Sequence, residues 1–204
     1  TLPSVGIASN GNGDVPSFTA VNTSVLPVTA NFTVVPNALQ CSGPAELFSI
    51  TVNPTPTVDP MPSIEECAGV VQPAIQPTGD YSSIEWTNSN SSIGIPSLGN
   101  TQIPSFTLVN SSNSTVNQSV VVFTPVFTNA GVQCFGLSEQ FDIVINPLPD
   151  ADPIGDVDLC NGEISSIVSL SGTGTYYEWT NNNLSIGLAA NGNGDVPVFN
   201  ATNT

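Results

Sequence analysis

The sequence predicts an all-β protein made of antiparallel β-sandwich domains. Short runs alternate apolar with polar residues, turn residues separate these runs, and the whole pattern repeats along the chain. In "FSITV", Phe48, Ile50 and Val52 point one way, and "FDIVI" repeats this with Phe141 and its neighbours. A period of two is typical of strands with one buried face. No stretch shows a helical period, and the 18 prolines disfavour long helices.

The strands can be assigned in order along the middle of the chain. We expect strands near 57–66, 69–76 and 81–87, two more from "PSFTLVN" and "SVVVFTPVF", and a last one at 140–146. The run "ISSIVSL" at 164–170 predicts a further strand. About seven strands in each repeat is the number found in a two-sheet sandwich of the immunoglobulin type.

An internal repeat sets the domain organisation. "SIEWTNSNSSIGIPS" at 83–97 matches "YYEWTNNNLSIGLAA" at 176–190, which aligns Trp86 with Trp179 at a spacing of 93 residues. The same spacing carries Cys67 to Cys160 and Cys41 to Cys134. A repeat of this length is the size of a domain, so tandem domains are expected.

Proline clusters in "ITVNPTPT" and "IVINPLPD" end a strand and place the domain boundaries there. Residues 54–147 are then one complete repeat, 1–53 are the C-terminal part of a preceding repeat, and 148–204 are the N-terminal part of the next one. Either the chain is a piece of a longer array, or its ends complement a neighbouring chain by strand addition. Because 1–23 and 182–204 duplicate one segment, we favour a longer array.

The charge of the chain excludes several partners. It has no Lys, Arg or His and 16 Asp plus Glu, which gives a net charge of −16. Without cations it cannot neutralise phosphates, so we expect no nucleic acid partner. Anionic membrane surfaces are excluded in the same way, and no apolar run is long enough for membrane insertion. No secretory signal is recognised in the given residues, as expected of an interior piece of a longer protein.

The repeated pattern resembles a known family. The phrase "EWTN…N…SIG", followed by "GNGD-P-F-A-N", "C-G" and "F-I-V-NP-P", is similar to the PKD-like, immunoglobulin-like repeats of very large cell-surface adhesins of Bacteroidota. The resemblance covers essentially the whole chain. It implies tandem sandwich domains in an extracellular stalk at the cell surface, and it implies no catalytic or binding residues. The middle copy departs from the phrase, with "PSLGNTQIP" in place of "NGNGDVP".

Catalysis is not expected. A Ser or Cys nucleophile needs a base, and the chain has no His or Lys. Two carboxylates can hydrolyse glycosides, but Glu85 and Glu178 each precede a core-facing Trp on a strand. Both should therefore face solvent, and the chain is predicted not to be an enzyme.

Calcium is the one cofactor for which the chain offers ligands. Asp14 and Asp195 each end an Asn-Gly-Asn-Gly-Asp run with alternating oxygens, and Asp152 and Asp158 lie in the acidic junction "PDADPIGDVD". The runs lack the later acids of an EF-hand loop. We therefore favour turns, in which Gly and Asn supply positive φ angles, and predict no metal site.

The two Trp residues are predicted to be structural, with Trp86 and Trp179 in the cores of their repeats. The four cysteines, Cys41, Cys67, Cys134 and Cys160, contain no Cys-x-x-Cys pair, so we expect disulfides rather than a metal site. Cys67 and Cys134 are expected at opposite poles of the complete repeat. Disulfides that join neighbouring repeats, called staples below, are therefore favoured over a Cys67–Cys134 bond.

Together these features predict a structural stalk or filament segment of an extracellular repeat adhesin, which gives reach and stiffness at the cell surface. Its expected partners are neighbouring repeats of the same longer chain, with other copies in a filament as a second class. The alternative is a carbohydrate-binding accessory region of a secreted enzyme, which needs an exposed row of aromatic side chains. The Pro-rich junctions predict a rod with little bending.

Overall fold

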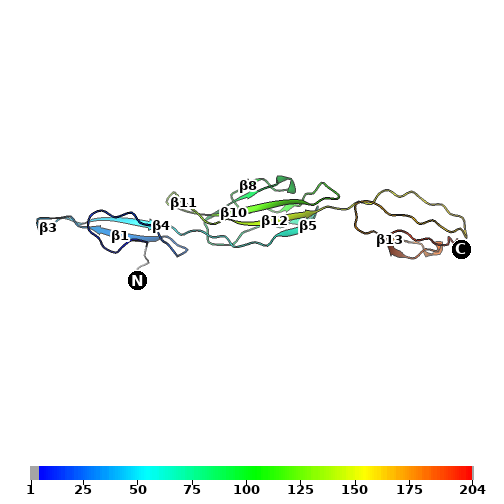
Figure 1. The fold of residues 1–204 in the computed structure, drawn as a ribbon, viewed down its shortest axis with the longest axis horizontal. Coiled ribbons are helices and arrows are strands. Elements are labelled where there is room, and N and C mark those ends of the chain that lie inside the picture. The colour runs from blue at the N-terminus through cyan, green and yellow to red at the C-terminus, as the bar shows by residue number, and fades with distance from the viewer. Residues whose placement is uncertain (1–4, 204) are drawn as a thin grey trace. The chain divides into compact units, whose positions relative to one another are not determined.

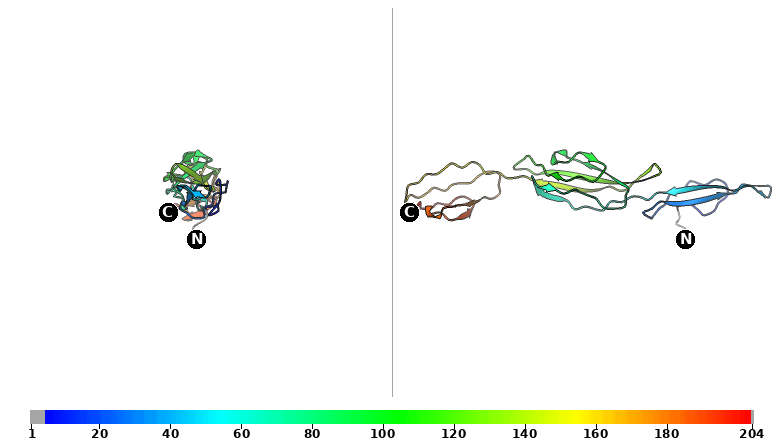
Figure 2. Two further views of the ribbon diagram at one scale, coloured as in Figure 1. Left: turned by 90° about the vertical axis from the view of Figure 1, so that its left-hand side faces the viewer. Right: turned by 180° about the vertical axis from the view of Figure 1, so that it is seen from behind.

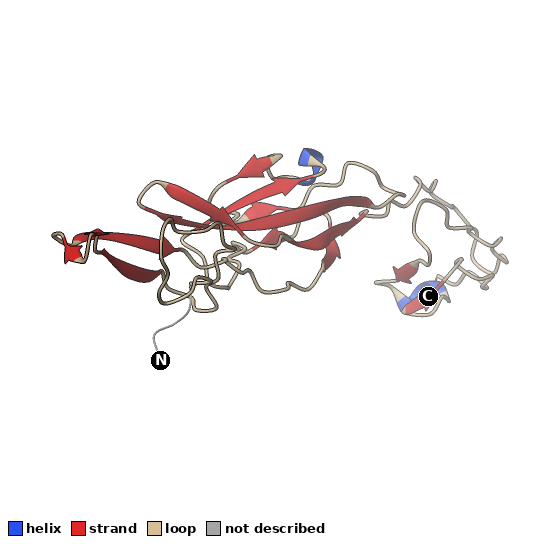
Figure 3. Cartoon of the chain, turned by 60° about the vertical axis from the view of Figure 1, so that its left-hand side comes forward, coloured by secondary structure: helices blue, strands red, loops and turns tan. Residues whose placement is uncertain are grey.

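The computed structural model describes residues 5–203, and this part of the chain is all-β (Figure 3). Its helical segments are two short 3₁₀ turns, Ser91–Ile93 and Leu184–Ile186. The strands are β1 (Val28–Val34), β2 (Asn37–Ala38), β3 (Cys41–Ser42), β4 (Glu46–Val52), β5 (Ile64–Cys67), β6 (Val71–Gln72), β7 (Ser83–Asn88), β8 (Leu98–Gly99), β9 (Phe106–Thr107), β10 (Asn117–Asn129), β11 (Val132–Phe135), β12 (Glu139–Asn146), β13 (Glu178–Thr180) and β14 (Asn191–Asn193).

Contacts along the chain define two compact units. The first contains the residues up to Ile64, with Val71–Phe106 and Gln118–Ile143. The second contains Glu65–Val70, Thr107–Asn117 and the residues from Val144 onwards. The predicted domain boundaries after residues 53 and 147 follow the sequence repeat rather than these contacts, and they stay a prediction.

A long antiparallel hairpin forms the start of the first unit (Figure 1). Strand β1 pairs with β4 from Val28 opposite Val52 to Val34 opposite Glu46, and the short pair β2–β3 extends the hairpin towards its turn. Phe32 lies opposite Phe48 in this register. Residues 5–27, in dark blue, run alongside the hairpin, and their Asn22 side chain donates to the Val52 carbonyl at 2.8 Å.

The largest sheet has the strand order β5-β12-β10-β7-β8, with β11 beside β10 (Figures 1 and 2). Strand β10 pairs with β7 so that Phe123 lies opposite Trp86. A separate pair, β6–β9, is continued by a bridge between Ile75 and Ile103. The described chain is therefore all-β with several sheets, and these sheets are compatible with a β-sandwich.

The core follows the period of two. In β12, Phe141, Ile143 and Ile145 have exposed fractions of 4, 0 and 0%, so the apolar face predicted for "FDIVI" is buried. In β7, Ile84 and Trp86 are buried, while Ser83, Glu85 and Thr87, which alternate with them, face solvent. A fully buried side chain of this size contributes about 1.5–3 kcal/mol relative to an exposed one.

Two predicted strands are much shorter than expected. The strand at 57–66 is reduced to β5, because Pro60 and Pro62 have no N–H to donate to a ladder. The strand at 69–76 is reduced to β6, which Pro73 follows, and to the single bridge at Ile75. Backbone bonds from Thr57 N to Asp80 O and from Asp59 N to Thr78 O still tie the first of these segments to its neighbour.

The end of the second unit has few regular strands. Strand β13 pairs with β14, with Trp179 opposite Gly192. The predicted strand at 164–170 appears only as isolated bridges, from Ile164 to Asn200 and from Val168 to Val196. The segment 164–170 is therefore extended and paired at two points, without a continuous ladder.

Candidate functional site

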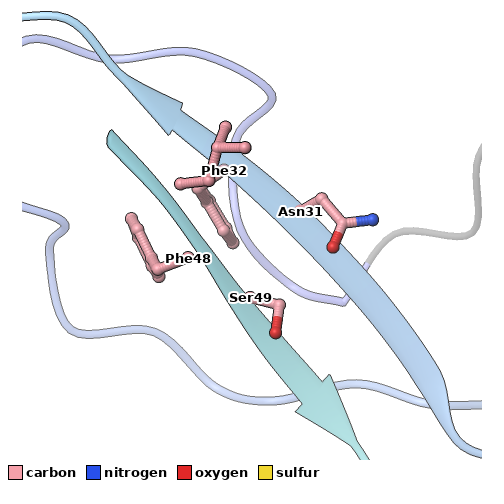
Figure 4. Close-up of a pocket in the computed structure, with 5 residues that line it drawn as sticks. Asn31, Phe32, Phe48 and Ser49 are labelled. Carbon is pink, nitrogen blue, oxygen red and sulfur yellow. The ribbon is translucent and has the colours of Figure 1, made fainter. Parts of the chain in front are cut away.

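An uncovered apolar face on the β1–β4 hairpin is the main candidate for an interaction site. The rings of Phe32 and Phe48 stack with their centroids 4.6 Å apart and their planes 8° apart (Figure 4). Phe48 is 40% exposed and Phe32 is half-buried. An open depression of about 310 Å³ runs along the pair, and Asn31, Leu47 and Ser49 complete its lining. Such a face can bind another apolar surface.

The same aromatic pair occurs in the middle of the chain, where it is covered. The rings of Phe123 and Phe141 stack at 5.7 Å and 13°. Their exposed fractions are 1 and 4%. The sequences around the first ring of each pair, "NFTV" and "VFTP", share Phe-Thr. Among residues 5–203, the β1–β4 face thus repeats a core surface without the cover that buries Phe123 and Phe141.

The uncovered face was not among the residues predicted from the sequence. The "Phe-Thr" dipeptides and the equivalent Phe48 and Phe141 were available as signals. The exposure itself depends on which segments cover the hairpin, and no local pattern reports that. These signals could have pointed to the pair, which the sequence analysis did not identify, but not to its exposure.

Repeated asparagines are used to hold the fold. The Asn110 side chain donates to the carbonyls of Thr115 at 2.8 Å and Ile145 at 2.9 Å, and its oxygen accepts from Ser112 N. Asn22 makes the matching bonds in its own copy of the sequence. Because these side chains satisfy backbone groups, they act as structural clamps rather than as free ligands.

A second pair of asparagines caps the two 3₁₀ turns. Asn90 and Asn183 each accept a hydrogen bond from the backbone two residues ahead, at 3.1 Å in both copies. Gly94 and Gly187 end the turns with φ angles of 110° and 89°. The phrase "N-x-S-I-G" therefore encodes a capped turn that recurs with the repeat.

The calcium candidates do not come together in the described chain. No group of three or more His, Cys, Asp or Glu side chains that could hold a metal exists among residues 5–203. Asp195 accepts from Leu170 N at 2.8 Å, and Asp152 accepts from the Ser171 hydroxyl at 2.7 Å. Asp14 and Asp158 are exposed. Two of the four carboxylates thus accept hydrogen bonds from other residues of the chain.

The glycines of the repeated phrase have two different roles. Gly13 and Gly194 have φ angles of 80° and 74°, as the turn interpretation requires. An added Cβ on Gly192 would lie 2.3 Å from the Trp179 ring, and one on Gly99 would lie 2.4 Å from Trp86. Because a Cβ would clash with the indole ring, the close contact with Trp requires glycine at the first glycine position of the run.

The prediction that the asparagines of this phrase also supply positive φ angles is wrong. Among the described non-glycine residues, positive φ occurs only at Leu39, Gln40 and Ala130. The glycines alone carry this requirement, because a residue without a Cβ adopts these angles at no steric cost.

The two Trp residues differ in burial. Trp86 is 4% exposed, and its indole N–H donates to the Thr101 carbonyl at 2.7 Å. Trp179 is half-buried, and its buried indole N–H has no hydrogen-bond partner. Trp86 thus belongs to a core, and Trp179 belongs to a copy of it that is less covered. Glu85 and Glu178 beside them are exposed.

The four cysteines are free thiols in this structure. Cys41, Cys67 and Cys160 are exposed, and Cys134 is partly buried. The structure holds no bond between Cys67 and Cys134. The proposed staples need partners outside residues 5–203, so they stay a prediction.

Two comparisons with known proteins identify no related protein. The sequence matches no protein-family model, and a search of curated proteins finds no match either. Within the described residues, no helix has the length and apolar character to cross a membrane.

Proposed function

We propose that the chain is a structural segment of an extracellular repeat adhesin, built from tandem immunoglobulin-like sandwich domains that give reach and stiffness at the cell surface. The observation that carries this proposal is the use of the repeated residues. The asparagine clamps, the capped turns and the Trp–Gly contacts recur between copies, and each holds the fold. Residues that recur because they hold the fold are what a spacer built of tandem domains needs.

The contacts at the proline-rich junctions support stiffness. After β4, the Asn53 side chain accepts a hydrogen bond from Asn129 at 2.8 Å, and Pro56 is fully buried. A Cβ added to Gly136 would lie 1.9 Å from the Pro56 carbonyl oxygen, so the chain passes directly against this glycine. Prolines fixed in this way leave few freely rotating bonds at a junction.

The second junction has similar bonds. The Asn113 side chain donates to the Asp150 carboxylate at 2.8 Å, and the Asp150 N–H donates to the Thr173 hydroxyl at 2.8 Å. The partners proposed for the segment are neighbouring repeats of the same longer chain, and staples from the exposed cysteines are a further proposal.

Carbohydrate binding, the alternative function, needs aromatic rings exposed in a row. Trp86 is 4% exposed, so its face is unavailable for stacking on a sugar. Binding of the chain to a defined glycan on an array would nevertheless favour this alternative over a stalk.

A pulling experiment tests whether the segment resists mechanical force. With the two ends of the chain held, residues 54–147 should resist force and then unfold in one step. The gain in length should be on the order of 300 Å, since an extended residue spans about 3.3–3.6 Å. Extension of this segment without a force peak would contradict the proposal.

A further inference from the structure

The first and last strands of the repeat 54–147 are neighbours in the largest sheet. Strand β5 pairs with β12, and within the described residues β5 lies at the edge of this sheet with β12 beside it (Figure 1). The chain enters the repeat ahead of β5 and leaves it directly after β12. A force along the chain therefore enters and leaves the repeat through two strands that are bonded to each other.

The contacts at the two ends of this pair show that the strands run parallel. At the start of β5, the Ser63 hydroxyl accepts a hydrogen bond from Asp142 N at 3.3 Å. At the end of β5, Ala68 N donates to Asn146 O at 3.0 Å. The residue numbers therefore rise in the same direction along both strands, whereas in an antiparallel pair they would rise in opposite directions.

Parallel pairing determines how tension acts on the two strands. Tension draws β5 towards its N-terminal end and β12 towards its C-terminal end. Because these ends point in opposite directions along a parallel pair, the strands are pulled lengthwise past each other, and the hydrogen bonds between them are stretched together. If the two strands were instead pulled apart from one end, each bond would bear the whole force in turn and the bonds would break one after another.

Hydrogen bonds contribute most of the attachment of β5. The side chains of Glu65, Glu66 and Cys67 are exposed and Ile64 is half-buried, so the strand buries little apolar surface. One side-chain bond is added, because Asn146 Nδ2 donates to the Glu65 carboxylate at 3.1 Å. The direction in which these bonds are loaded therefore decides how firmly the strand is held.

We propose that β5 and β12 are the force-bearing strand pair of the repeat, and that the repeat resists tension until the bonds between these two strands break together. This inference rests on the proposed stalk function, to which it adds the place where the force is carried. It also makes the resistance directional: the repeat is strong when pulled along the chain and weak when β5 is peeled from β12.

The first test pulls one chain in two directions. In a chain with Cys41→Ser, Cys134→Ser and Cys160→Ser, the exposed Cys67 at the end of β5 can carry a handle. Force between the two chain ends loads the strands lengthwise, whereas force between Cys67 and the C-terminus pulls on neighbouring ends of β5 and β12. At equal force, residues 68–147 should then unfold at least about tenfold faster, with a gain in length on the order of 250 Å.

Two proline variants test the bonds themselves. Because Ala68 N faces β12 and N–H groups alternate along a strand, Glu66 N also faces β12, and Glu65 N faces away from it. Glu66→Pro removes an inward N–H, and Glu65→Pro removes an outward one with the same loss of charge. With the chain ends held, Glu66→Pro should unfold at least about tenfold faster than wild type at equal force. Glu65→Pro should change the rate less than about threefold, although it also loses the bond from Asn146.

The outcomes separate this inference from the proposed function. A wild-type chain that extends without a force peak when its ends are held would contradict the stalk itself. A wild-type force peak together with equal unfolding rates in the two pulling directions, or with equal rates for Glu65→Pro and Glu66→Pro, would overturn the force-bearing strand pair and leave the stalk proposal standing. The comparison of directions changes no residue of β5 or β12, so it decides the question even if a proline variant does not fold.

Discussion

Phe123→Ala is expected to lower the free energy of unfolding of the segment 54–147 by about 3–5 kcal/mol, the usual cost of removing a buried phenyl ring. The ring is 1% exposed and stacks on Phe141 at 5.7 Å. Its loss removes apolar burial and leaves a cavity, since the neighbouring strands relax only in part. Urea unfolding followed by the fluorescence of Trp86, which lies opposite Phe123, measures the effect.

Val120→Ala is the matched control for this prediction. Val120 lies on the same strand and is 36% exposed, so its substitution should change the stability by no more than about 0.5 kcal/mol. Equal losses for the two variants would mean that the β10 face is not the core of this segment.

Gly99→Ala is expected to destabilise the same segment by about 1–3 kcal/mol, as overpacking of a core does. The new Cβ would lie 2.4 Å from the Trp86 ring, which its own hydrogen bond to Thr101 holds in place. Trp86→Phe removes the ring atoms that the Cβ meets. In that background the cost of Gly99→Ala should fall, which a double-mutant cycle detects as a coupling of about 0.5–3 kcal/mol.

Gly11 provides the control for Gly99, because it occupies the same place in the repeated phrase and nothing lies within 4 Å of its added Cβ. Gly11→Ala should be neutral or stabilise by up to about 1 kcal/mol, since Ala restricts the unfolded chain. A similar loss at both glycines would show that backbone conformation, rather than the Trp ring, explains the cost.

Local sequence patterns were sufficient to predict the strands that bury one face. Strand β12 follows the alternation of Phe141, Ile143 and Ile145, and β7 follows the alternation around Trp86. Alternation failed where prolines removed N–H donors, as at Pro60 and Pro62. The sequence pattern reports which face is apolar, but only the ladder partners decide how long a strand is.

The candidate site was harder to predict, because its features depend on contacts distant in sequence. Phe32 and Phe48 stack like the core pair Phe123 and Phe141, but no segment among residues 5–203 buries Phe48, which is 40% exposed. Asp195 was a possible calcium ligand by sequence, but its carboxylate accepts from Leu170 N. The identity of one residue does not tell which segment buries its side chain or which group forms a hydrogen bond with it.

The central claim, that the chain is a stiff spacer, is tested most directly by small-angle scattering of the 204-residue chain combined with imaging of single molecules. We expect a narrow distribution of angles at both junctions, because the Asn53–Asn129 and Asn113–Asp150 contacts and the surrounding prolines restrict rotation there. The distribution should broaden in Asn129→Ala at the first junction only. Freely variable angles at both junctions of the wild-type chain would contradict the account.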